Sequence, residues 1–319
     1  MAKQTRAETA LFLMERDRYA IVTHRRPDGH TLGSAAVLCL GLRKLGKTAY
    51  ILENPEITEK YAHLHKGITK PQAAENDTLL CVDVASGNML PECFAALEDR
   101  IVLRIDHHGT ATSFTPWELV DPETAACGEI IYDVLSQMGA QLDVPMANAL
   151  YTAISTDTGC FRYANTTANT FRVAAACAAV SPDLFQINQV LFDTNTLGRL
   201  RLQGWIVENA RFLANGRIAI CALSLDLERQ LGLTEDDMEN ISGFPRSIEG
   251  VKIAATLRES ADGLVKLSVR AVPGYDAAAI CAKFGGGGHK GAAGASLKLP
   301  LQEAVEAVKA AMPDMGALE

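Results

Sequence analysis

Short apolar runs alternate with longer segments of helical periodicity through the first half of the chain. Each run has four or five mostly apolar residues between polar ones, which predicts buried strands at Tyr19–Thr23, Ala49–Leu52, Thr78–Val82 and Ile101–Ile105. The helical segments lie between or after these runs, at Gly33–Leu45, Gly128–Met138, Pro145–Ser155, Asn169–Val180 and the stretch that Ser181-Pro182 begins. This alternation predicts an α/β fold with a doubly wound, mostly parallel sheet and helices on both faces.

The second half of the chain has a different rhythm. One helix is expected to connect the halves, at Leu197–Leu213. Strand-like runs and helical segments follow at Ile218–Leu225, Val251–Leu257, Leu264–Val269, Asp276–Phe284 and Leu301–Ala311. We therefore expect an N-terminal domain at residues 1–190, a connecting helix or linker at 191–212, and a smaller α/β domain at 213–319.

Composition and charge exclude several classes of protein. The 319 residues are 48% hydrophobic and 21% charged, which is typical of a folded globular protein. The net charge of −8 argues against binding of long duplex nucleic acid through overall charge. A small anionic substrate still fits, because metals or local arginines can reverse the field inside one cleft. The chain has no signal-peptide core and no apolar run near the roughly 20 residues that span a bilayer, so we expect a cytoplasmic protein without a membrane segment.

The eight cysteines also indicate a cytoplasmic protein. They are scattered singly, without a CxxC pair, and most lie in apolar runs. Buried, reduced thiols explain this distribution better than disulfides or a zinc site.

Histidine is scarce, yet five of the seven histidines fall in three short motifs, THRRPDGH, IDHHGT and FGGGGHKGAAG. His24 and Asp28 follow the first predicted strand, Asp83 the third, and Asp106–His108 the fourth. Because ligands collect at the carboxyl ends of parallel strands, we expect these side chains to converge on one metal site. A single aspartate after a strand is commonly a helix cap or turn former. The prediction of a metal site therefore depends on polar side chains following three strands of the same sheet. Mixed carboxylate and imidazole ligands favour Mn²⁺ or Mg²⁺ over structural zinc.

These motifs resemble those of the DHH/DHHA1 phosphoesterases of the RecJ-like superfamily, and most closely the NrnA-type branch of bifunctional oligoribonucleases and pAp phosphatases. The resemblance covers nearly the whole chain in five motifs that occur in the family's order: THRRPDGHTLGS, VDVAS, IDHHGT, TAISTDTGCFRYANT and GGGGH. It implies a DHH domain joined by a helix to a smaller DHHA1 domain, with the active cleft between them.

The resemblance also implies two divalent cations. We expect both to be Mn²⁺, with Mg²⁺ or Co²⁺ as alternatives. His24, Asp28 and Asp83 match the ligands of the first metal. Asp83, His107 and Asp157 match three ligands of the second metal, which makes Asp83 the bridge.

His30 departs from the family's pattern, because it stands where the family has the second aspartate of its PDGD motif. An imidazole binds Mn²⁺, so we expect His30 to be the fourth ligand of the second metal. The alternative is that His30 faces away from the site and the second metal is weakly held.

Two further residues of the DHH motif match catalytic positions of the family. Asp106 resembles the aspartate that orients the neighbouring imidazole. His108 resembles the histidine that contacts the scissile phosphate and stabilises charge on it.

The second domain matches the family's substrate-binding segment. The run Gly286, Gly287 and Gly288 before His289 lets backbone amides approach an anion, and Arg270 matches the family's phosphate clamp. Glycine runs elsewhere are commonly flexible loops. For Arg258, which ends another strand, the alternatives are a role beside Arg270 in phosphate binding and a solvated surface residue, and we expect the second.

Together these features predict a two-metal phosphoesterase that removes 5′ mononucleotides from very short oligoribonucleotides or dephosphorylates pAp. The expected partners are a short single-stranded RNA or a nucleotide, with no long duplex and no membrane, and a homodimer is compatible with the sequence. One alternative is a soluble phosphodiesterase for pApA or cyclic dinucleotides. The other is a non-catalytic nucleotide-binding regulator.

Overall fold

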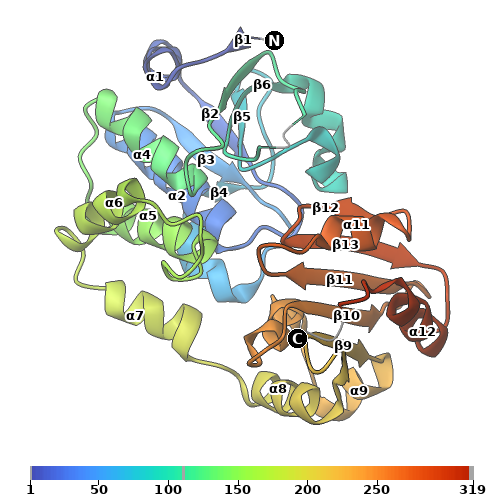
Figure 1. Ribbon diagram of the computed structural model, residues 1–319. Helices are drawn as coiled ribbons and strands as arrows, with labels where there is room; N and C mark the ends of the chain where they lie inside the picture. Colours follow the sequence, from blue (N-terminus) through green and yellow to red (C-terminus); the bar gives the residue numbers. More distant parts are fainter. Residues whose placement is uncertain (1, 110–111, 316–319) are drawn as a thin grey trace. The chain divides into compact units, whose positions relative to one another are not determined.

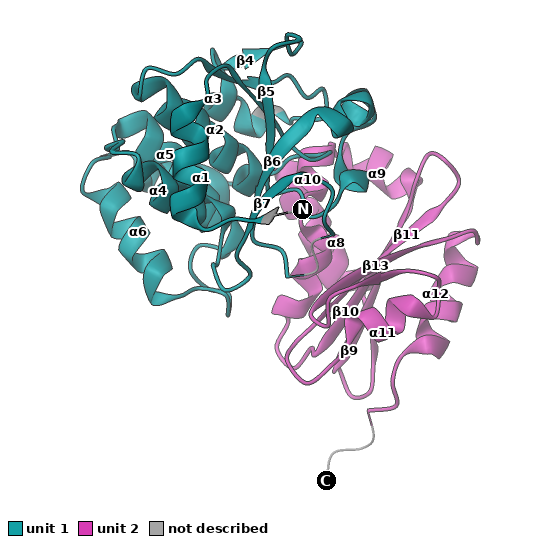
Figure 2. Cartoon of the chain, turned by 90° about the horizontal axis from the view of Figure 1, so that it is seen from above, with its two compact units in different colours: residues 1–194 teal, residues 195–319 magenta. Residues whose placement is uncertain are grey.

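The computed structural model describes residues 2–109 and 112–315, and the chain forms two compact units. The first unit spans residues 1–194 and the second residues 195–319 (Figure 1; Figure 2, teal and magenta). Each unit has its own sheet and its own hydrophobic core.

The first unit is built on a seven-stranded sheet in which every pairing is parallel. The strand order is β1-β7-β6-β5-β2-β3-β4. The chain therefore moves outward from β2 in one direction, returns, and moves outward from β5 in the other, which confirms the doubly wound prediction. The strands are β1 (Ala2–Lys3), β2 (Tyr19–Val22), β3 (Ala49–Leu52), β4 (Thr69–Lys70), β5 (Thr78–Val82), β6 (Ile101–Asp106) and β7 (Trp117–Val120).

The two faces of this sheet are covered differently. Alternate strand residues such as Ile21 pack into a core with helices α1, α2, α4 and α5, while Val22 packs on the other face with Leu90 and Phe94. Helices therefore lie on both faces, as predicted, although on the second face the connection between β5 and β6 supplies 3₁₀ helices. The helical elements are α1 (Arg6–Glu15), α2 (Gly29–Lys44), η1 (Glu59–Tyr61), α3 (Ala62–His65), η2 (Gly87–Met89), η3 (Glu92–Arg100), α4 (Cys127–Gln137), α5 (Val144–Asp157), α6 (Ala168–Ala178), α7 (Leu184–Asn188) and η4 (Gln189–Asp193).

Close packing of α2 against α5 brings the start of one helix to the end of the other. A Cβ atom on Gly33 would lie 2.5 Å from the carbonyl oxygen of Ala149, so only glycine allows the two backbones to approach. A Cβ atom on Gly29 would lie 2.7 Å from the side chain of Thr156. The N-terminus of α2 and the C-terminus of α5 are consequently neighbours.

The second unit holds a six-stranded mixed sheet in the order β12-β13-β11-β10-β9-β8. Only β9 and β10 pair in parallel. One face packs on α11 and α12, and the other on α8. The strands are β8 (Arg211–Leu213), β9 (Ile218–Leu223), β10 (Ile253–Glu259), β11 (Val265–Ala271), β12 (Gly287–Gly288) and β13 (Ala292–Leu297); the helical elements are α8 (Leu197–Asn209), α9 (Leu225–Leu231), α10 (Glu235–Met238), η5 (Ile241–Ser247), α11 (Ala277–Ala282) and α12 (Leu301–Ala311).

The predicted connecting helix is too long at its C-terminal end. It stops at Asn209, and Arg211–Leu213 instead form β8, which pairs with β9. Leu225 likewise begins α9 and does not end the preceding strand, because Ser224 caps that helix. In both places a neighbouring strand or a cap decides the state of residues whose hydrophobic pattern is ambiguous.

No helix among the described residues is long and apolar enough to cross a membrane. All eight cysteines are free, and only Cys93 is exposed.

Candidate metal centre

The predicted site residues of the first unit converge at the carboxyl ends of three adjacent strands, β6, β5 and β2. His24 lies two residues after β2, Asp83 directly follows β5, and Asp106 is the last residue of β6. The order of the strands reverses between β2 and β5, and in open α/β sheets this is where ligands bind.

Asp83 is the centre of this cluster and is 2% exposed. Its φ of 59° lies in the left-handed region, which is uncommon for a residue other than glycine. Burial raises the pKa of Asp83, but the imidazoles of His30 and His24 lower it by more, to well below its usual value. The carboxylate is therefore ionised.

The two carboxylate oxygens of Asp83 differ in their surroundings. Oδ2 accepts a hydrogen bond from Thr31 Oγ1 at 2.5 Å. Oδ1 is buried and has no hydrogen-bond partner, although His107 Nε2 and His108 Nδ1 lie 3.8 and 3.7 Å away. An ionised oxygen that is buried without a partner is costly unless a cation binds it.

His24, Asp28 and Asp83 present ligand atoms that all lie within 4.8 Å of one another. His24 Nδ1 faces the carbonyl oxygen of Arg25 at 2.7 Å, and this contact fixes the ring with Nε2 toward the cluster. Asp28 caps α2 by accepting a hydrogen bond from the amide of Thr31 at 3.0 Å. Two carboxylates and one imidazole in fixed positions suit a hard divalent cation.

Ligand atoms of His107, His30 and Asp83 also lie within 4.8 Å of one another, and Asp157 Oδ1 lies 3.6 Å from His30 Nδ1. His107 Nδ1 lies 3.2 Å from the carbonyl oxygen of Thr124, which leaves Nε2 toward Asp83. Burial lowers the pKa of His107, which favours the neutral ring that binds metals. Asp157 ends α5, and its Oδ2 accepts a hydrogen bond from Asn165 Nδ2 at 3.1 Å.

His30 faces the cluster from the first turn of α2 and is 4% exposed. Its Nδ1 lies 3.1 Å from Asp83 Oδ2 and 3.6 Å from Asp157 Oδ1. Its Nε2 accepts a hydrogen bond from the backbone amide of Cys127 at 2.9 Å. Burial lowers the pKa of His30, but Asp83 and Asp157 raise it by more, to about 10.

Asp106 and His108 form a separate pair beside Asp83. Asp106 is fully buried, and its Oδ1 lies 2.7 Å from His108 Nδ1. This hydrogen bond raises the pKa of His108, while burial opposes the shift. Because the His108 side chain is 30% exposed, its ring can be reached from solvent.

Two residues of the site were not found by sequence reasoning. Arg104 is 1% exposed and donates hydrogen bonds to the carbonyl oxygens of Ala85 and Thr112, at 2.8 and 3.2 Å, while its charge pairs with Glu118 at 3.1 Å. It therefore holds the loop that follows Asp83. The sequence did contain a signal for Arg104: it is a charged residue inside the apolar strand IVLRID. A charged side chain that is buried must find partners. The other residue is Thr31, whose hydroxyl also lies 2.5 Å from His24 Nε2.

Comparisons with known proteins agree with this arrangement. The profile of the DHH family, N-terminal domain, matches residues 18–154, and that of the DHHA1 domain matches residues 215–314. The bifunctional oligoribonuclease and PAP phosphatase NrnA of Thermus thermophilus is 33% identical over 291 residues, which are 90% of this chain and 87% of that protein. The chain belongs to the DHH/DHHA1 phosphoesterase family.

Solved structures share the fold of this phosphoesterase. An exopolyphosphatase-related protein from Bacteroides fragilis superposes with a TM-score of 0.85 at 23% identity, over 96% of this chain and 95% of that one. The exonuclease RecJ bound to manganese has a TM-score of 0.50 at 14% identity, over 98% of this chain and 94% of that one.

In the DHHA1 domain, the glycine run forms the edge strand β12 and the turn before it. A Cβ atom on Gly286 would lie 2.2 Å from the carbonyl oxygen of Gly294, and one on Gly288 would lie 2.7 Å from that of Ala292. A side chain on Gly287 would meet nothing within 4 Å. Two of the three glycines thus have a structural reason in the contact with β13, and the third lies open.

The two arginines of this domain have different surroundings. Arg270 lies near the end of β11, and its Nη1 donates a hydrogen bond to the carbonyl oxygen of Val269. The expectation that Arg258 is a solvated surface residue is wrong. Its guanidinium forms paired hydrogen bonds with Glu228, at 2.7 and 3.0 Å, and with Glu235, at 3.1 and 2.7 Å.

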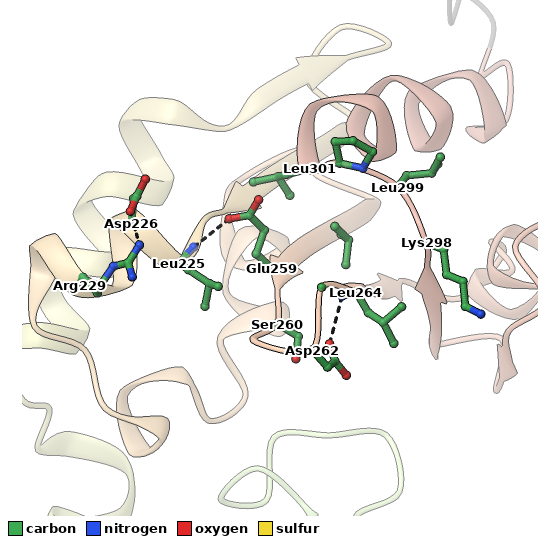
Figure 3. Close-up of a pocket in the computed structure, with 13 residues that line it drawn as sticks. Leu225, Asp226, Arg229, Glu259, Ser260, Asp262, Leu264, Lys298, Leu299 and Leu301 are labelled. Carbon is green, nitrogen blue, oxygen red and sulfur yellow. Dashed lines mark hydrogen bonds and ion pairs between the residues drawn. The ribbon is translucent and has the colours of Figure 1, made fainter.

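A cavity of about 730 Å³ also lies within the DHHA1 domain, between α9, the turn after β10 and the segment before α12 (Figure 3). None of the predicted site residues lines it. Its acidic groups are engaged within the protein: Glu259 and Asp262 accept backbone hydrogen bonds from Leu225 and Leu264, and Asp226 pairs with Arg229. This cavity does not offer the uncompensated charge that is found around Asp83.

Proposed function

We propose that this phosphoesterase releases 5′ mononucleotides from very short oligoribonucleotides and removes a phosphate from pAp. One observation carries the proposal: the buried, ionised and unpartnered Oδ1 of Asp83 lies among imidazoles and carboxylates at the carboxyl ends of β2, β5 and β6. The substrate class is taken from the activity named for the Thermus relative. The net charge of −8 supports a short substrate over a long one.

The proposed first metal site consists of His24, Asp28 and Asp83. Asp83 would also bridge to a second position with His107 and Asp157. Mixed nitrogen and oxygen donors favour Mn²⁺, with Mg²⁺ or Co²⁺ as substitutes, and the structurally similar RecJ was solved with manganese. A bound divalent cation would supply a Lewis acid that lowers the pKa of water and neutralises charge on a phosphate.

His108 is proposed to contact the scissile phosphate. Asp106 holds its Nδ1, so the remaining nitrogen is left to donate a proton or a hydrogen bond to a phosphate oxygen. The raised pKa of His108 supports this role, because it favours the charged, donating ring near neutral pH.

Arg270, His289 and the amides of Gly286–Gly288 are proposed to bind another phosphate of the substrate. A guanidinium suits bidentate contact with phosphate. The open space beside Gly287 supports the approach of an anion to the backbone of β12.

The test is a panel assay with the full chain and Mn²⁺, Mg²⁺ or Co²⁺ in separate reactions. The substrates are RNA of two to five nucleotides, pAp, pApA, cyclic di-AMP and polyphosphate, and Asp83→Asn protein prepared in parallel controls for contaminating nucleases. Metal-dependent release of mononucleotides from RNA, or of phosphate from pAp, supports the proposal.

Two other outcomes lead to different functions. Turnover restricted to pApA or cyclic di-AMP would identify a dinucleotide phosphodiesterase. Nucleotide binding by calorimetry without hydrolysis under any metal would identify a non-catalytic regulator.

A further inference from the structure

His30 presents one nitrogen to the metal cluster and the other to the backbone of α4. Nδ1 lies 3.1 Å from Asp83 Oδ2 and 3.6 Å from Asp157 Oδ1. Nε2 accepts the amide hydrogen of Cys127 at 2.9 Å. A neutral imidazole has one N–H and one lone pair. Because the lone pair of Nε2 accepts the amide hydrogen, the proton of the neutral ring lies on Nδ1.

The direction of the Cys127 amide is set by the helix. Cys127 is the first residue of α4, and amides in the first turn have no acceptor inside the helix. The N-cap residue, Ala126, supplies no side-chain acceptor, and Cys127 is fully buried, which keeps water away. Within the described part of the chain, His30 Nε2 is the acceptor of this amide.

Other states of the ring lose these contacts. A half turn about the Cβ–Cγ bond replaces Nε2 by Cε1 and Nδ1 by Cδ2, so neither hydrogen bond survives. A charged ring would carry a second proton on Nε2, directly opposite the amide hydrogen of Cys127. The amide hydrogen of Cys127 occupies the position that a proton on Nε2 would need, and the start of α4 holds this amide in place.

A metal ligand must offer a lone pair, and the nitrogen of His30 that faces the cluster carries a proton. We propose that His30 is a hydrogen-bond donor to Asp83, and not a ligand of the second metal, so that this chain holds one divalent cation tightly, at His24, Asp28 and Asp83. The inference rests on the metal-dependent function proposed above. It departs from the four-ligand second site that the family resemblance implies.

The second position then retains three ligands and faces a positive N–H dipole. Asp83, His107 and Asp157 remain, but Nδ1–H of His30 points toward the carboxylates that would hold the cation. An anionic oxygen of the family's aspartate is thus replaced by a hydrogen-bond donor. A second cation should bind much more weakly than the first.

The first experiment counts metals. Titration of the metal-free full-length protein with Mn²⁺, by calorimetry and equilibrium dialysis, should give one tight ion per chain and a second at least about tenfold weaker. Electron paramagnetic resonance at one equivalent should show an uncoupled ion. The His30→Asp variant should bind two Mn²⁺ ions with similar affinity and show the spectrum of a coupled pair.

A matched pair of variants at Cys127 tests the cause. Lactic acid in place of Cys127, introduced by nonsense suppression, turns the amide into an ester of nearly the same shape, so it removes the amide hydrogen from this contact together with the thiol. His30 can then carry its proton on Nε2 and offer Nδ1 to the metal, and the second Mn²⁺ should bind about tenfold more tightly or better. Cys127→Ala removes the thiol and keeps the amide, so its metal binding should remain that of the wild type.

Long-range proton–nitrogen correlation spectra of the wild type show which ring nitrogen of His30 carries the proton. This measurement does not depend on the folding of a variant at Cys127. The His30 signals, identified by their loss in His30→Gln, should show a protonated Nδ1 and an unprotonated Nε2, with and without Mg²⁺. A protonated Nε2 in the Mg²⁺-loaded protein would overturn the proposal. So would two equally tight Mn²⁺ ions in the wild type, or an equal gain in Cys127→Ala and in the lactic-acid variant.

These results are separable from the proposed function. Two tight metals together with hydrolysis would remove the role given to His30 and leave the phosphoesterase activity standing. One tight metal without hydrolysis of any substrate in the panel would support the role of His30 and contradict the activity.

Discussion

Each unit of this protein holds a cluster of charged side chains, and the charges of the two clusters are neutralised in different ways. In the DHHA1 domain, Arg258 lies between Glu228 and Glu235 and uses its guanidinium hydrogens in four hydrogen bonds to them. In the first unit, the ion pairs of Asp83 and Asp157 within the described residues are all to histidines.

The difference shows which cluster is built for stability and which for function. A carboxylate that is paired with a guanidinium in the same domain has its charge neutralised by the chain itself. Around Asp83 no guanidinium takes this place: its ion pairs among the described residues are to imidazoles, and its Oδ1 has no hydrogen-bond partner. Folding therefore leaves a negative charge that an external cation can neutralise, as at many functional sites.

The largest expected effect follows from removing the uncompensated charge. Asp83→Asn should reduce turnover by at least about 1,000-fold, because a neutral amide cannot hold the cation that the proposed chemistry needs. Asparagine is a better test than alanine, since it tolerates the left-handed backbone at this position. The free energy of unfolding of the metal-free protein should change by less than about 1 kcal/mol, because the hydrogen-bond acceptor is kept.

Initial rates and urea unfolding, measured on the same preparation, provide the check. Retention of more than about a tenth of the wild-type rate would show that the charge of Asp83 is not what the reaction uses.

Arg270→Ala should have the next largest effect on activity. It tests whether Arg270 serves the substrate, in contrast to Arg258 of the same domain. Loss of a charge-assisted contact with a phosphate costs about 1.5–3 kcal/mol, which lowers kcat/KM by roughly 10- to 150-fold. Mn²⁺ affinity should not change. Lys266→Ala is the matched control, because Lys266 is a cation on the same strand whose Nζ donates a hydrogen bond to Ser296. Loss of Mn²⁺ binding in Arg270→Ala, seen by calorimetry, would contradict this division between the two units.

Arg258→Met should lower stability and not activity. It leaves the half-buried Glu228 without its partner, at a cost of about 1–3 kcal/mol in urea unfolding. The rate per folded chain should equal that of the wild type. The double variant Arg258→Met/Glu228→Met should recover most of the lost stability, because it removes the unpaired charge. A normal stability together with reduced kcat/KM would mean that Arg258 serves the substrate.

The smallest expected effect is the pH dependence of stability caused by Asp237, which is 3% exposed. Burial raises the pKa of Asp237, but hydrogen bonds from Thr196 and Thr234 lower it by more, to below its usual value. A lowered pKa means that the unfolded chain binds the proton more readily, so the contribution is present above about pH 4 and lost as the pH falls below it.

Urea unfolding at pH 6 and pH 3 should show this loss for the wild type. Asp237→Asn should lose about 1 kcal/mol at pH 6 and depend less on pH. Equal pH dependence in the two proteins would show that Asp237 is not responsible.

The sequence by itself determined the strands of the first sheet that are buried on both faces and the residues at their carboxyl ends. A continuous apolar run is a strong local signal, and the polar residue that follows it marks where the strand ends. His24, Asp83 and Asp106–His108 could therefore be placed together from β2, β5 and β6 alone.

The short outer strands could not be predicted from the hydrophobic pattern of the sequence. β1, β4 and β12 have two residues each, and their backbone groups adopt the extended state only because a neighbouring strand offers partners. The same reason explains Arg211–Leu213, whose pairing with β9 overrides a helical pattern.

The tertiary structure alone decided how the site is completed. The position of Arg104 behind the Asp83 loop and of the Cys127 amide beside His30 depends on contacts between residues 20 or more positions apart. Residue type shows that His30 can bind a metal, but the hydrogen bond on its other nitrogen decides whether a lone pair is available. That bond comes from the start of α4, and no local pattern around His30 contains it.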